Sequence, residues 1–496
     1  MLTQPDGLLK YLTDASSLRL PQGHFIDGEF RRSRSGRSMQ SEDPGRGEAF
    51  ADFARGDADD IADAVSSSRK GFAVWRRTPP ADRGRVLNRT AELIRQNAER
   101  LAIAECLDSG KPIGEARGDV SGAARTFEYY AGACDKLEGQ VFPLPSGYVG
   151  FSQHEPVGVT AHIIPWNFPI STAARGMAPA LAAGCSVIAK PAEQTPFTAL
   201  LLAELLAQAG LPAGVCNVVT GTGVEAGAPL VAHTGIDHVT FTGSVATGAH
   251  VMRACAENVT RSVMELGGKS PVVVLDDCDF DAAIANVTGA IFEHAGQICS
   301  AGSRLVIEAG IHDRFVETLA KKAAAISLGH GLRSPDMGPV NSAAQRDKIL
   351  GFLDRARERG AEFLAGGLAA TAAESGKGYF IEPTIVASRP QDDELVQEEI
   401  FGPVLTVQKA DDADHALHLA NCTRFGLVAG VFTRDFSRAH QLARDIDAGQ
   451  VYINEYFAGG IEVPFGGNKQ SGFGREKGLE GLKSYCKTKS IAARIG

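Results

Sequence analysis

Short β-branched runs alternate with helical segments between residues 157 and 266, and this alternation constrains the fold more than any other feature of the chain. Each run is short enough for a strand, and the segment at 196–209 carries apolar residues at helical spacing. Such βαβ repetition predicts an α/β fold built on a parallel, doubly wound sheet. The expected strands are 157–164, 186–189, 215–219, 238–241 and 261–264, and the expected helices are 171–183, 196–209, 224–232 and 245–256.

Polar or glycine residues follow the carboxyl end of each of these strands. Ligands of open α/β sheets bind at that edge, at the point where the strand order reverses. The sequence therefore predicts a binding site at this edge. Its candidate residues are Trp166-Asn167, Lys190, Gly221, Gly243-Ser244 and Glu265.

A second α/β unit follows, with a continuous apolar strand at 272–275 and a helix at 280–292. Glu265 closes the first unit and Cys299 lies in the second, so we expect the site between two domains. A hairpin at 141–154 and a tail at 484–495 show no core of their own. Further expected elements are a helix at 115–137, strands at 304–307, 404–408, 427–432 and 451–454, and a helix at 312–325.

Composition excludes several classes of protein. The length of 496 residues gives a prior of about three domains, and the net charge of −9 without a long basic run argues against nucleic acid. Nine cysteines occur singly, which argues against a zinc cluster or a disulfide framework and suits a reducing cytoplasm. No apolar stretch fits a secretory signal or a membrane span. We expect a cytoplasmic enzyme with no metal and no membrane partner.

Cys299 in Gly296-Gln297-Ile298-Cys299-Ser300 lies 34 residues after Glu265, which begins Glu265-Leu266-Gly267-Gly268-Lys269. A thiol and a carboxylate in such glycine-bracketed segments predict a covalent nucleophile and a general base acting on a carbonyl. An ordinary thiol is only slightly ionised at neutral pH, so Cys299 needs an activating charge. The other eight cysteines are interpreted as small buried hydrophobes.

Two segments are candidates for a dinucleotide. Gly221-Thr222-Gly223-Val224-Glu225-Ala226 matches the G-x-G-x-x-A fingerprint, although it also fits an ordinary glycine-rich turn. Phe241-Thr242-Gly243-Ser244 offers a helix N-terminus whose free N–H groups can hold a pyrophosphate. No acidic residue closes the strand after the first segment, so the usual ribose partner is missing from that unit.

Three polar side chains at the sheet edge have two interpretations each. Lys190 and Glu193 can grip a ribose or form a surface ion pair, and in the first case the Glu193 charge favours NAD over NADP. Asn167, held between Pro165 and Pro169, is either a turn asparagine or a fixed amide donor for an oxyanion.

With these motifs assembled, the chain resembles the aldehyde dehydrogenase superfamily along nearly its whole length. The matching motifs are Pro165-Trp166-Asn167-Phe168-Pro169, Lys190-Pro191-Ala192-Glu193-Gln194-Thr195-Pro196, Phe241-Thr242-Gly243-Ser244, Glu265-Leu266-Gly267-Gly268-Lys269, Gly296-Gln297-Ile298-Cys299, Glu398-Glu399-Ile400-Phe401-Gly402-Pro403 and Pro464-Phe465-Gly466-Gly467. The resemblance implies a Rossmann-like NAD-binding domain (1–138 and 155–265), a catalytic domain (266–465) and an oligomerisation element (139–154 and 480–496). It also implies a homodimer or homotetramer.

The resemblance further implies the role of each site residue. Cys299 would attack the aldehyde, Asn167 and the Cys299 backbone N–H would hold the oxyanion, and Glu265 would activate the water that hydrolyses the thioester. Glu399 would bind the nicotinamide ribose beside Phe401, and Lys190 and Glu193 the adenosine ribose. The implied cofactor-binding set is Ile164, Trp166, Lys190, Glu193, Gly223, Gly243, Ser244, Leu266, Glu399 and Phe401.

The expected substrate tunnel is lined by Phe168, Arg175, Glu293 and Phe457. Arg175 stands where simple aliphatic and betaine aldehyde members usually have Trp, and semialdehyde members often have Arg there to pair with a carboxylate. Their second arginine is Glu293 in this chain, and a serine that they often carry is Gly460. Arg175 and Glu293 therefore either select polar aldehydes or semialdehydes, or pair with each other.

Several alternatives stay open at this point. The substrate can instead be a betaine aldehyde, an aminoaldehyde or a broad range of aliphatic and aromatic aldehydes. An acylating, CoA-dependent enzyme is disfavoured because that branch tends to lack the Glu265 equivalent. A thiol esterase would leave Lys190, Ser244 and Glu399 without a role, and a non-catalytic NAD-binding protein would leave Cys299, Glu265 and Asn167 unused.

Overall fold

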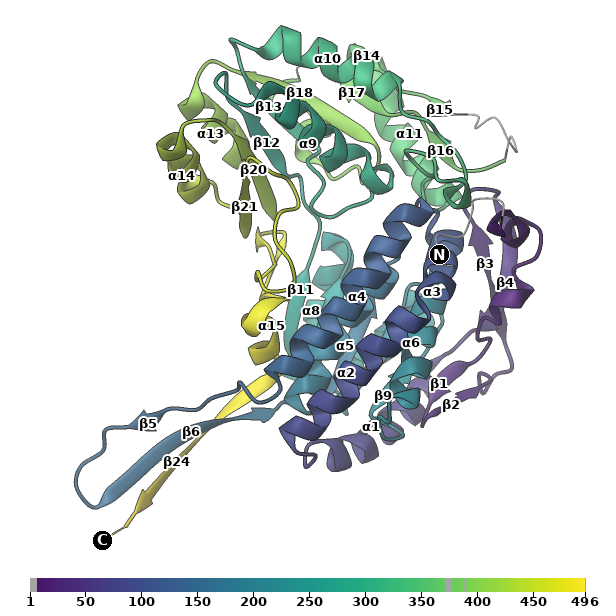
Figure 1. Ribbon diagram of the computed structural model, residues 1–496, viewed down its shortest axis with the longest axis vertical. Helices are drawn as coiled ribbons and strands as arrows, with labels where there is room; N and C mark the ends of the chain where they lie inside the picture. Colours follow the sequence, from purple (N-terminus) through teal and green to yellow (C-terminus); the bar gives the residue numbers. More distant parts are fainter. Residues whose placement is uncertain (1–6, 371–376, 388, 496) are drawn as a thin grey trace.

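The computed structural model describes residues 7–370, 377–387 and 389–495, and two parallel sheets, each with its own core, dominate this part of the chain (Figure 1). The five central strands of the first sheet are parallel, as the βαβ alternation predicts. In spatial order its strands are β2 (Glu29–Arg31), β1 (His24–Ile26), β9 (Cys216–Val218), β8 (Ser186–Pro191), β7 (Val159–Ile164), β10 (His238–Thr242), β11 (Arg261–Glu265) and β23 (Gly472–Phe473).

Helices cover both faces of the first sheet, so the sheet is doubly wound. One face packs against the largest apolar core, and the opposite face packs against a smaller one. The helices on the first face are α2 (Pro80–Gln96), α3 (Ala98–Ser109), α4 (Ile113–Ala133), α5 (Pro169–Ala183) and α6 (Phe197–Gln208). Those on the second face are α1 (Ala58–Trp75), α7 (Ala228–Ala232) and α8 (Val245–Glu257).

The start and end of α5 follow from its sequence, and α5 carries the segment after Asn167. Pro169 occupies its first turn, where a missing N–H costs nothing. Gly184 ends the helix at φ +96°, a backbone conformation that glycine adopts without a steric penalty. Asn167 and Phe168 therefore stand directly before a rigid, buried helix.

The second sheet has seven strands, and all its pairings except that of the edge strand β14 are parallel. In spatial order these are β14 (Phe363–Ala365), β17 (Thr384–Val386), β18 (Val404–Ala410), β13 (Arg304–Glu308), β12 (Pro271–Val274), β20 (Val428–Phe432) and β21 (Gln450–Ile453). Its helices are α9 (Phe280–Phe292), α10 (His312–Ala324), α11 (Ala343–Glu358), α12 (Glu394–Gln397), α13 (Ala413–Asn421) and α14 (Phe436–Asp445).

A long antiparallel arm projects from the body of the molecule (Figure 1). The arm consists of β5 (Val141–Phe142), β6 (Tyr148–Pro156) and β24 (Cys486–Arg494), with β24 paired to β6 along its whole length. The predicted hairpin and the predicted tail thus form one sheet. Their lack of a core agrees with this exposed position.

The sequence analysis assigned a continuous helix to 224–232, and the structure differs there. Residues Gly223–Gly227 form a π-helical turn, and only Ala228–Ala232 is α-helical. Pro229 has no N–H to donate to the preceding turn, and the Ala228 N–H bonds instead to Gly223 O, five residues back.

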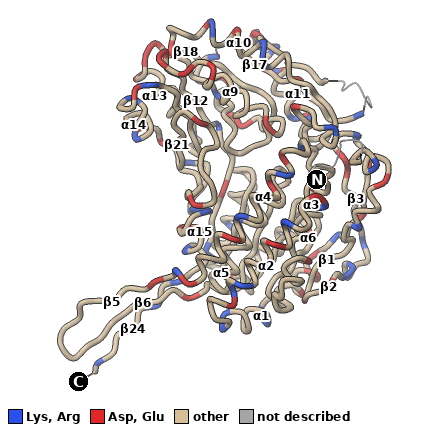
Figure 2. The backbone as a smooth tube through the Cα atoms, viewed as in Figure 1, with Lys and Arg blue, Asp and Glu red and all other residues tan. Residues whose placement is uncertain are grey.

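The sequence analysis also left the N-terminal region largely unassigned. It contains α1 to α3, the strand pair β1–β2 and a second strand pair, β3 (Ser38–Asp43) with β4 (Glu48–Ala54). Charged residues of both signs are scattered over the body (Figure 2). In the part of the chain that the structure describes, no helix has the length and apolar character needed to cross a bilayer.

Candidate active site

The Cys299 thiol lies on a tight loop between α9 and β13, next to the first sheet. His294 and Ala295 adopt left-handed backbone conformations, with φ of +47° and +52°, and turn the chain sharply after α9. Gln297 holds the loop, because its side chain donates to His294 O (3.1 Å) and accepts from Asn341 N (2.8 Å). Cys299, the predicted nucleophile, therefore follows a strained turn that these hydrogen bonds hold.

Burial raises the pKa of the Cys299 thiol to about 11, and the Arg175 guanidinium opposes this rise. In this state of the site the thiol form predominates at neutral pH. Ionisation of Cys299 therefore requires additional positive charge or the loss of negative charge nearby.

Asn167 and the Cys299 loop are in direct contact. The buried Asn167 side chain donates from Nδ2 to the backbone carbonyl of Gln297 at 2.8 Å. The accepting carbonyl lies two residues before Cys299, so this hydrogen bond orients the Asn167 amide, the predicted oxyanion donor, beside the Cys299 loop.

Glu265 ends β11 and is almost fully buried, with 2% of its surface exposed. Neither of its carboxylate oxygens has a hydrogen-bond partner among the described residues. Burial and, second, the neighbouring Glu476 carboxylate raise the pKa of Glu265 well above its ordinary value. A carboxyl group in this environment accepts a proton from water only after it has ionised, and its raised pKa then makes it a strong base.

Arg175 does not pair with Glu293. Its Nη2 lies 2.6 Å from Oε2 of Glu476, and the Glu293 side chain forms no ion pair or hydrogen bond among the described residues. The segment between β23 and α15 (Gly478–Ser484) brings Glu476 to Arg175, whereas Glu293 lies on the side of Asp119 and Lys111. The interpretation in which Arg175 and Glu293 neutralise each other is therefore wrong.

One cavity joins the catalytic residues to most of the predicted cofactor ligands. Trp166 and Phe401 meet edge to face at 5.3 Å between ring centroids, and Glu399 Oε1 accepts from Gly268 N at 3.1 Å. Burial raises the pKa of Glu399 to about 6. The predicted residues in this cavity are Trp166, Asn167, Phe168, Arg175, Gly243, Ser244, Glu265, Leu266, Cys299, Glu399 and Phe401.

Three other predicted cofactor ligands, Ile164, Lys190 and Glu193, lie at the ends of neighbouring strands outside this cavity. Lys190 is buried, and its Nζ lies 3.1 Å from Glu193 Oε2. Burial lowers the pKa of Lys190, and Glu193 opposes the effect. Gly227 in the glycine-rich turn passes so close that an added Cβ would lie 3.8 Å from Lys190 Cδ.

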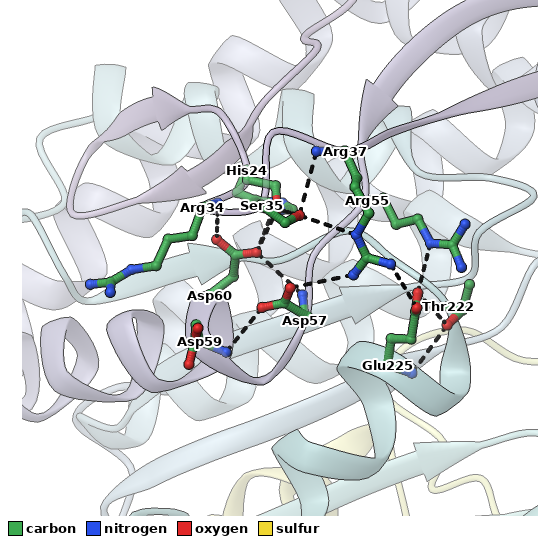
Figure 3. Close-up of polar contacts among 11 residues, drawn as sticks. His24, Arg34, Ser35, Arg37, Arg55, Asp57, Asp59, Asp60, Thr222 and Glu225 are labelled. Carbon is green, nitrogen blue, oxygen red and sulfur yellow. Dashed lines mark hydrogen bonds and ion pairs between the residues drawn. The ribbon is translucent and has the colours of Figure 1, made fainter.

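The glycine-rich turn itself, which includes the predicted ligand Gly223, is fastened to the N-terminal region (Figure 3). Thr222 Oγ1 accepts from Glu225 N at 3.1 Å. The Glu225 carboxylate pairs with Arg55 at 2.7 Å and with Arg37 at 2.9 Å, and these arginines lower the pKa of Glu225 to about 2. The turn is thereby held beside the sheet edge in one position.

A second cavity, of about 430 Å³, opens on the other side of the nucleophile. All four residues predicted for a substrate tunnel line it, and it shares Phe168, Arg175 and Cys299 with the first cavity. Cys299 therefore lies where the two cavities meet. The residues that line this cavity include Phe168, Ser171, Arg175, Glu293, Cys299, Phe457, Phe465 and Lys477.

Sequence reasoning missed three charged residues of the site, Glu476, Lys477 and Lys111. Lys111 is fully buried, pairs with Asp119 at 2.5 Å and lies over the Phe168 ring at 4.2 Å. Glu476 and Lys477 stand in Arg475-Glu476-Lys477, a charged run that is indistinguishable from a solvated surface in the sequence. No group of three or more His, Cys, Asp or Glu residues placed to bind a metal occurs among the described residues.

Comparison with known proteins identifies the family. Residues 30–491 match the model of the aldehyde dehydrogenase family. An aldehyde dehydrogenase of Aspergillus niger is 39% identical over 498 aligned residues, covering 100% of this chain and 98% of the relative.

Solved structures agree in fold as well as in sequence. A Burkholderia cenocepacia protein assigned as an aldehyde dehydrogenase is 45% identical with a TM-score of 0.94, covering 96% of this chain and 100% of the other. A Bacillus cereus aldehyde dehydrogenase solved as an NAD⁺ complex is 39% identical with a TM-score of 0.95, covering 97% and 98% of the two chains. The chain therefore belongs to the aldehyde dehydrogenase family, and its class of activity is the oxidation of aldehydes.

Proposed function

We propose that the protein uses NAD⁺ and water to oxidise a polar aldehyde to its carboxylic acid, through a thioester on Cys299. The observation that carries the proposal is the position of Cys299 at the meeting point of the two cavities. One cavity holds the predicted nicotinamide ligands and the other holds the predicted substrate residues. An aldehyde carbon bound at Cys299 is thus accessible from both sides.

In the first stage Cys299 Sγ attacks the aldehyde carbon. The oxygen of the resulting thiohemiacetal carries negative charge, which the Asn167 amide and the Cys299 backbone N–H stabilise. Asn167 uses one N–H for Gln297 O, so its second N–H stays free for the oxyanion. Because Gln297 is itself held by His294 and Asn341, the donor does not have to reorganise when the charge develops.

A nicotinamide bound in the first cavity would supply the hydride acceptor needed to oxidise the thiohemiacetal to the thioester. Glu399 and Phe401 would hold the nicotinamide ribose and ring, and the N-terminus of α8 at Ser244 would hold the pyrophosphate. Lys190 and Glu193 would bind the adenosine ribose, where the Glu193 charge repels a 2′-phosphate. The Bacillus cereus relative with bound NAD⁺ supports this preference for NAD⁺ over NADP⁺.

In the second stage water hydrolyses the thioester and releases the acid. Glu265 takes the proton of that water, and its raised pKa suits this task. The presence of Glu265 within the catalytic cavity favours hydrolysis over transfer of the acyl group to CoA.

The substrate cavity favours a polar aldehyde. Phe168, Phe457 and Phe465 provide apolar walls, while Ser171, Glu293 and Lys477 place polar groups between them. Arg175 is neutralised by Glu476, so it does not by itself supply the charge that a semialdehyde carboxylate needs.

The test is NADH formation by the purified protein with a panel of neutral, carboxylated and amino-substituted aldehydes. We expect activity in the wild type and none in Cys299→Ala. Glu265→Gln should give a burst of about one NADH per site followed by slow turnover, because the thioester forms but is hydrolysed slowly. Absence of NADH with every aldehyde, or equal activity of Cys299→Ala, would overturn the proposal.

A further inference from the structure

Lys477 is a cation that lines the substrate cavity, and it has no role in the proposed mechanism. It lines the same cavity as Cys299 and is half-buried. Among the described residues it forms no ion pair, and its Nζ lies over the Phe465 ring at 5.3 Å from the centroid. An ammonium group removed from water without a carboxylate partner is costly, so its retention calls for a ligand.

The backbone at Lys477 is strained in a way that fixes its position. Its φ of +59° and ψ of 174° belong to a region that is nearly exclusive to glycine. The neighbours hold this conformation, because Glu476 exchanges two backbone hydrogen bonds with Phe465, and Gly478 N donates to Ile461 O. Glycine would adopt this conformation without strain, so a lysine at this position carries a backbone cost that its side-chain contacts must offset.

Three cations line the substrate cavity, and among the described residues only Lys477 of these three has no ion-pair partner. Arg125 pairs with Glu462, and Arg175 pairs with Glu476. Arg175 and Lys477 both lie over the Phe465 ring, at 5.4 Å and 5.3 Å from its centroid. A carboxylate on the substrate would supply the partner that Lys477 lacks.

We propose that Lys477 binds a carboxylate on the substrate, so that the enzyme prefers aldehydes that carry a carboxylate at the end remote from the reacting carbon. The inference rests on the proposed function and names the substrate class that the second cavity selects. Phe168 and Phe457 would contact the carbon chain between the two ends, and Lys477 would meet the charged end.

Glu293 supports the main alternative, an aldehyde that carries an ammonium group. It lines the same cavity and has no ion-pair partner among the described residues. However, burial and the neighbouring Asp119 raise the pKa of Glu293, and the charged groups that influence it are Asp119 and Lys111. Lys477 by contrast interacts electrostatically with Arg175, Glu476, Cys299 and Glu265. Lys477 therefore lies within electrostatic range of Cys299, as the far carboxylate of a short substrate bound at Cys299 requires.

The decisive comparison uses 4-oxobutanoate and its methyl ester, which differ by one charge at nearly the same length. We expect the wild type to favour the acid in kcat/KM. Lys477→Met should lower kcat/KM for the acid about 10- to 100-fold, the usual effect of losing a charged hydrogen bond, and change that for the ester less than about threefold. Lys477→Arg should retain most of the preference.

The matched control is Glu293→Gln, tested with the same pair of substrates and with 4-aminobutanal. We expect it to leave the preference for the acid intact. A wild type that prefers 4-aminobutanal, together with a loss of that preference in Glu293→Gln, would overturn the inference. Equal losses for acid and ester in Lys477→Met would also overturn it, since they would indicate a structural role.

The pH dependence of the acid-to-ester ratio of kcat/KM shows whether the charge of Lys477 or only the shape of its side chain determines the preference. Burial and, second, the Arg175 guanidinium lower the pKa of Lys477 to about 8. Glu476, Cys299 and Glu265 also face the ammonium group, and Glu462 lies near it. The ratio of acid to ester kcat/KM cancels the titration of Cys299 and Glu265, which act on both substrates.

Lys477 is positively charged below its pKa and neutral above it. We therefore expect the ratio to be highest below pH 8 and to fall as the pH rises through about 8 in the wild type, but not in Lys477→Arg. A ratio independent of pH in the wild type would overturn the inference. Turnover of neutral aldehydes without a preference for the acid refutes only this inference, whereas no turnover of any aldehyde refutes the proposed function.

Discussion

Glu476 sets the electrostatics of the site at the scale of single residues. It neutralises Arg175 at 2.6 Å and, after burial, is the largest influence that raises the pKa of Glu265. One carboxylate thus keeps the guanidinium from acting as a free substrate ligand and keeps the general base protonated until the pH rises. Neither effect is apparent from the local sequence around Arg175 or Glu265.

Replacement of Glu476 by Gln should move the pH profile of the hydrolysis step. Glu265 acts as a base only when ionised, so the rate rises as the pH increases through its pKa. Loss of the Glu476 charge lowers that pKa, and the rising limb of kcat should move to lower pH. The measurement is kcat against pH under conditions where thioester hydrolysis limits turnover. An unchanged limb would show that Glu476 does not act on Glu265.

Lys477→Gly should separate stability from specificity. Glycine adopts φ +59° and ψ 174° without strain, so the free energy of unfolding should rise by about 1 kcal/mol, part of the 1–3 kcal/mol typical of such strain. Lys477→Met keeps the strain and should show no gain. Thermal unfolding midpoints of the two variants and the wild type test this. A lower midpoint for Lys477→Gly than for Lys477→Met would contradict the strain assignment.

At the scale of elements, a buried arginine joins the start of the second sheet to a helix end. Arg304 at the start of β13 is fully buried and donates to Lys269 O, Leu419 O and Ala420 O at 2.8–2.9 Å. Two of these carbonyls belong to the last turn of α13, where a cation also opposes the helix dipole. Lys269 belongs to the segment that connects the two sheets.

Arg304→Lys should therefore destabilise the protein by about 2–4 kcal/mol, although it preserves the charge. A lysine ammonium cannot reach three carbonyls with the fixed fork of a guanidinium, and each abandoned buried acceptor costs about 1–3 kcal/mol. Chemical denaturation measures the loss. The matched control is the exposed Arg444→Lys, which should change stability by less than about 0.5 kcal/mol. Equal effects in the two variants would refute the assigned role of Arg304.

At the scale of the whole molecule, several apolar side chains of the arm are left exposed in a single chain. The arm carries them on strands that project beyond both cores (Figure 1), and its middle stretch is free of charged residues (Figure 2). The exposed apolar residues of the arm and its end are Val141, Leu144, Tyr148, Val149, Phe151 and Ile495. A contiguous apolar surface of this kind is typical of an interface with another copy.

We therefore expect Val141→Glu combined with Val149→Glu to lower the oligomeric state. Val141 is paired with Phe151, and Val149 lies two residues before Phe151 on the same face of the arm. Charges placed on the apolar side of the arm must lose their hydration in an interface, and this cost disfavours assembly. Light scattering after size-exclusion chromatography gives the molar mass. Gln96→Glu, an exposed change at the end of α2 and outside the arm, is the control and should leave the mass unchanged. An unaltered mass in the double variant would exclude the arm as the interface.

Local sequence patterns were sufficient to predict the central strands of the first sheet. The alternation of strands and helices predicted the parallel core of the first sheet, and β7, β8 and β10 occur close to their expected bounds. The composition and spacing of apolar residues predict such strands, because each strand buries a continuous apolar run. The π-turn at Gly223–Gly227 was not predicted, because it depends on Pro229 in the following helix. The pairing of β24 with β6 was not predicted either, because the two strands are far apart in the sequence.

The sequence by itself was sufficient to identify the family and to predict Cys299 as the nucleophile with the residues around it, because motifs of this kind place particular side chains at strand ends. Only the tertiary structure decided how the charges combine. Arg175 and Glu476 are 301 residues apart in the chain (476 − 175) and meet at 2.6 Å, while Lys477 receives no such partner. Ion pairing depends on distance and burial in the folded state, and neither is encoded in a local pattern of residues.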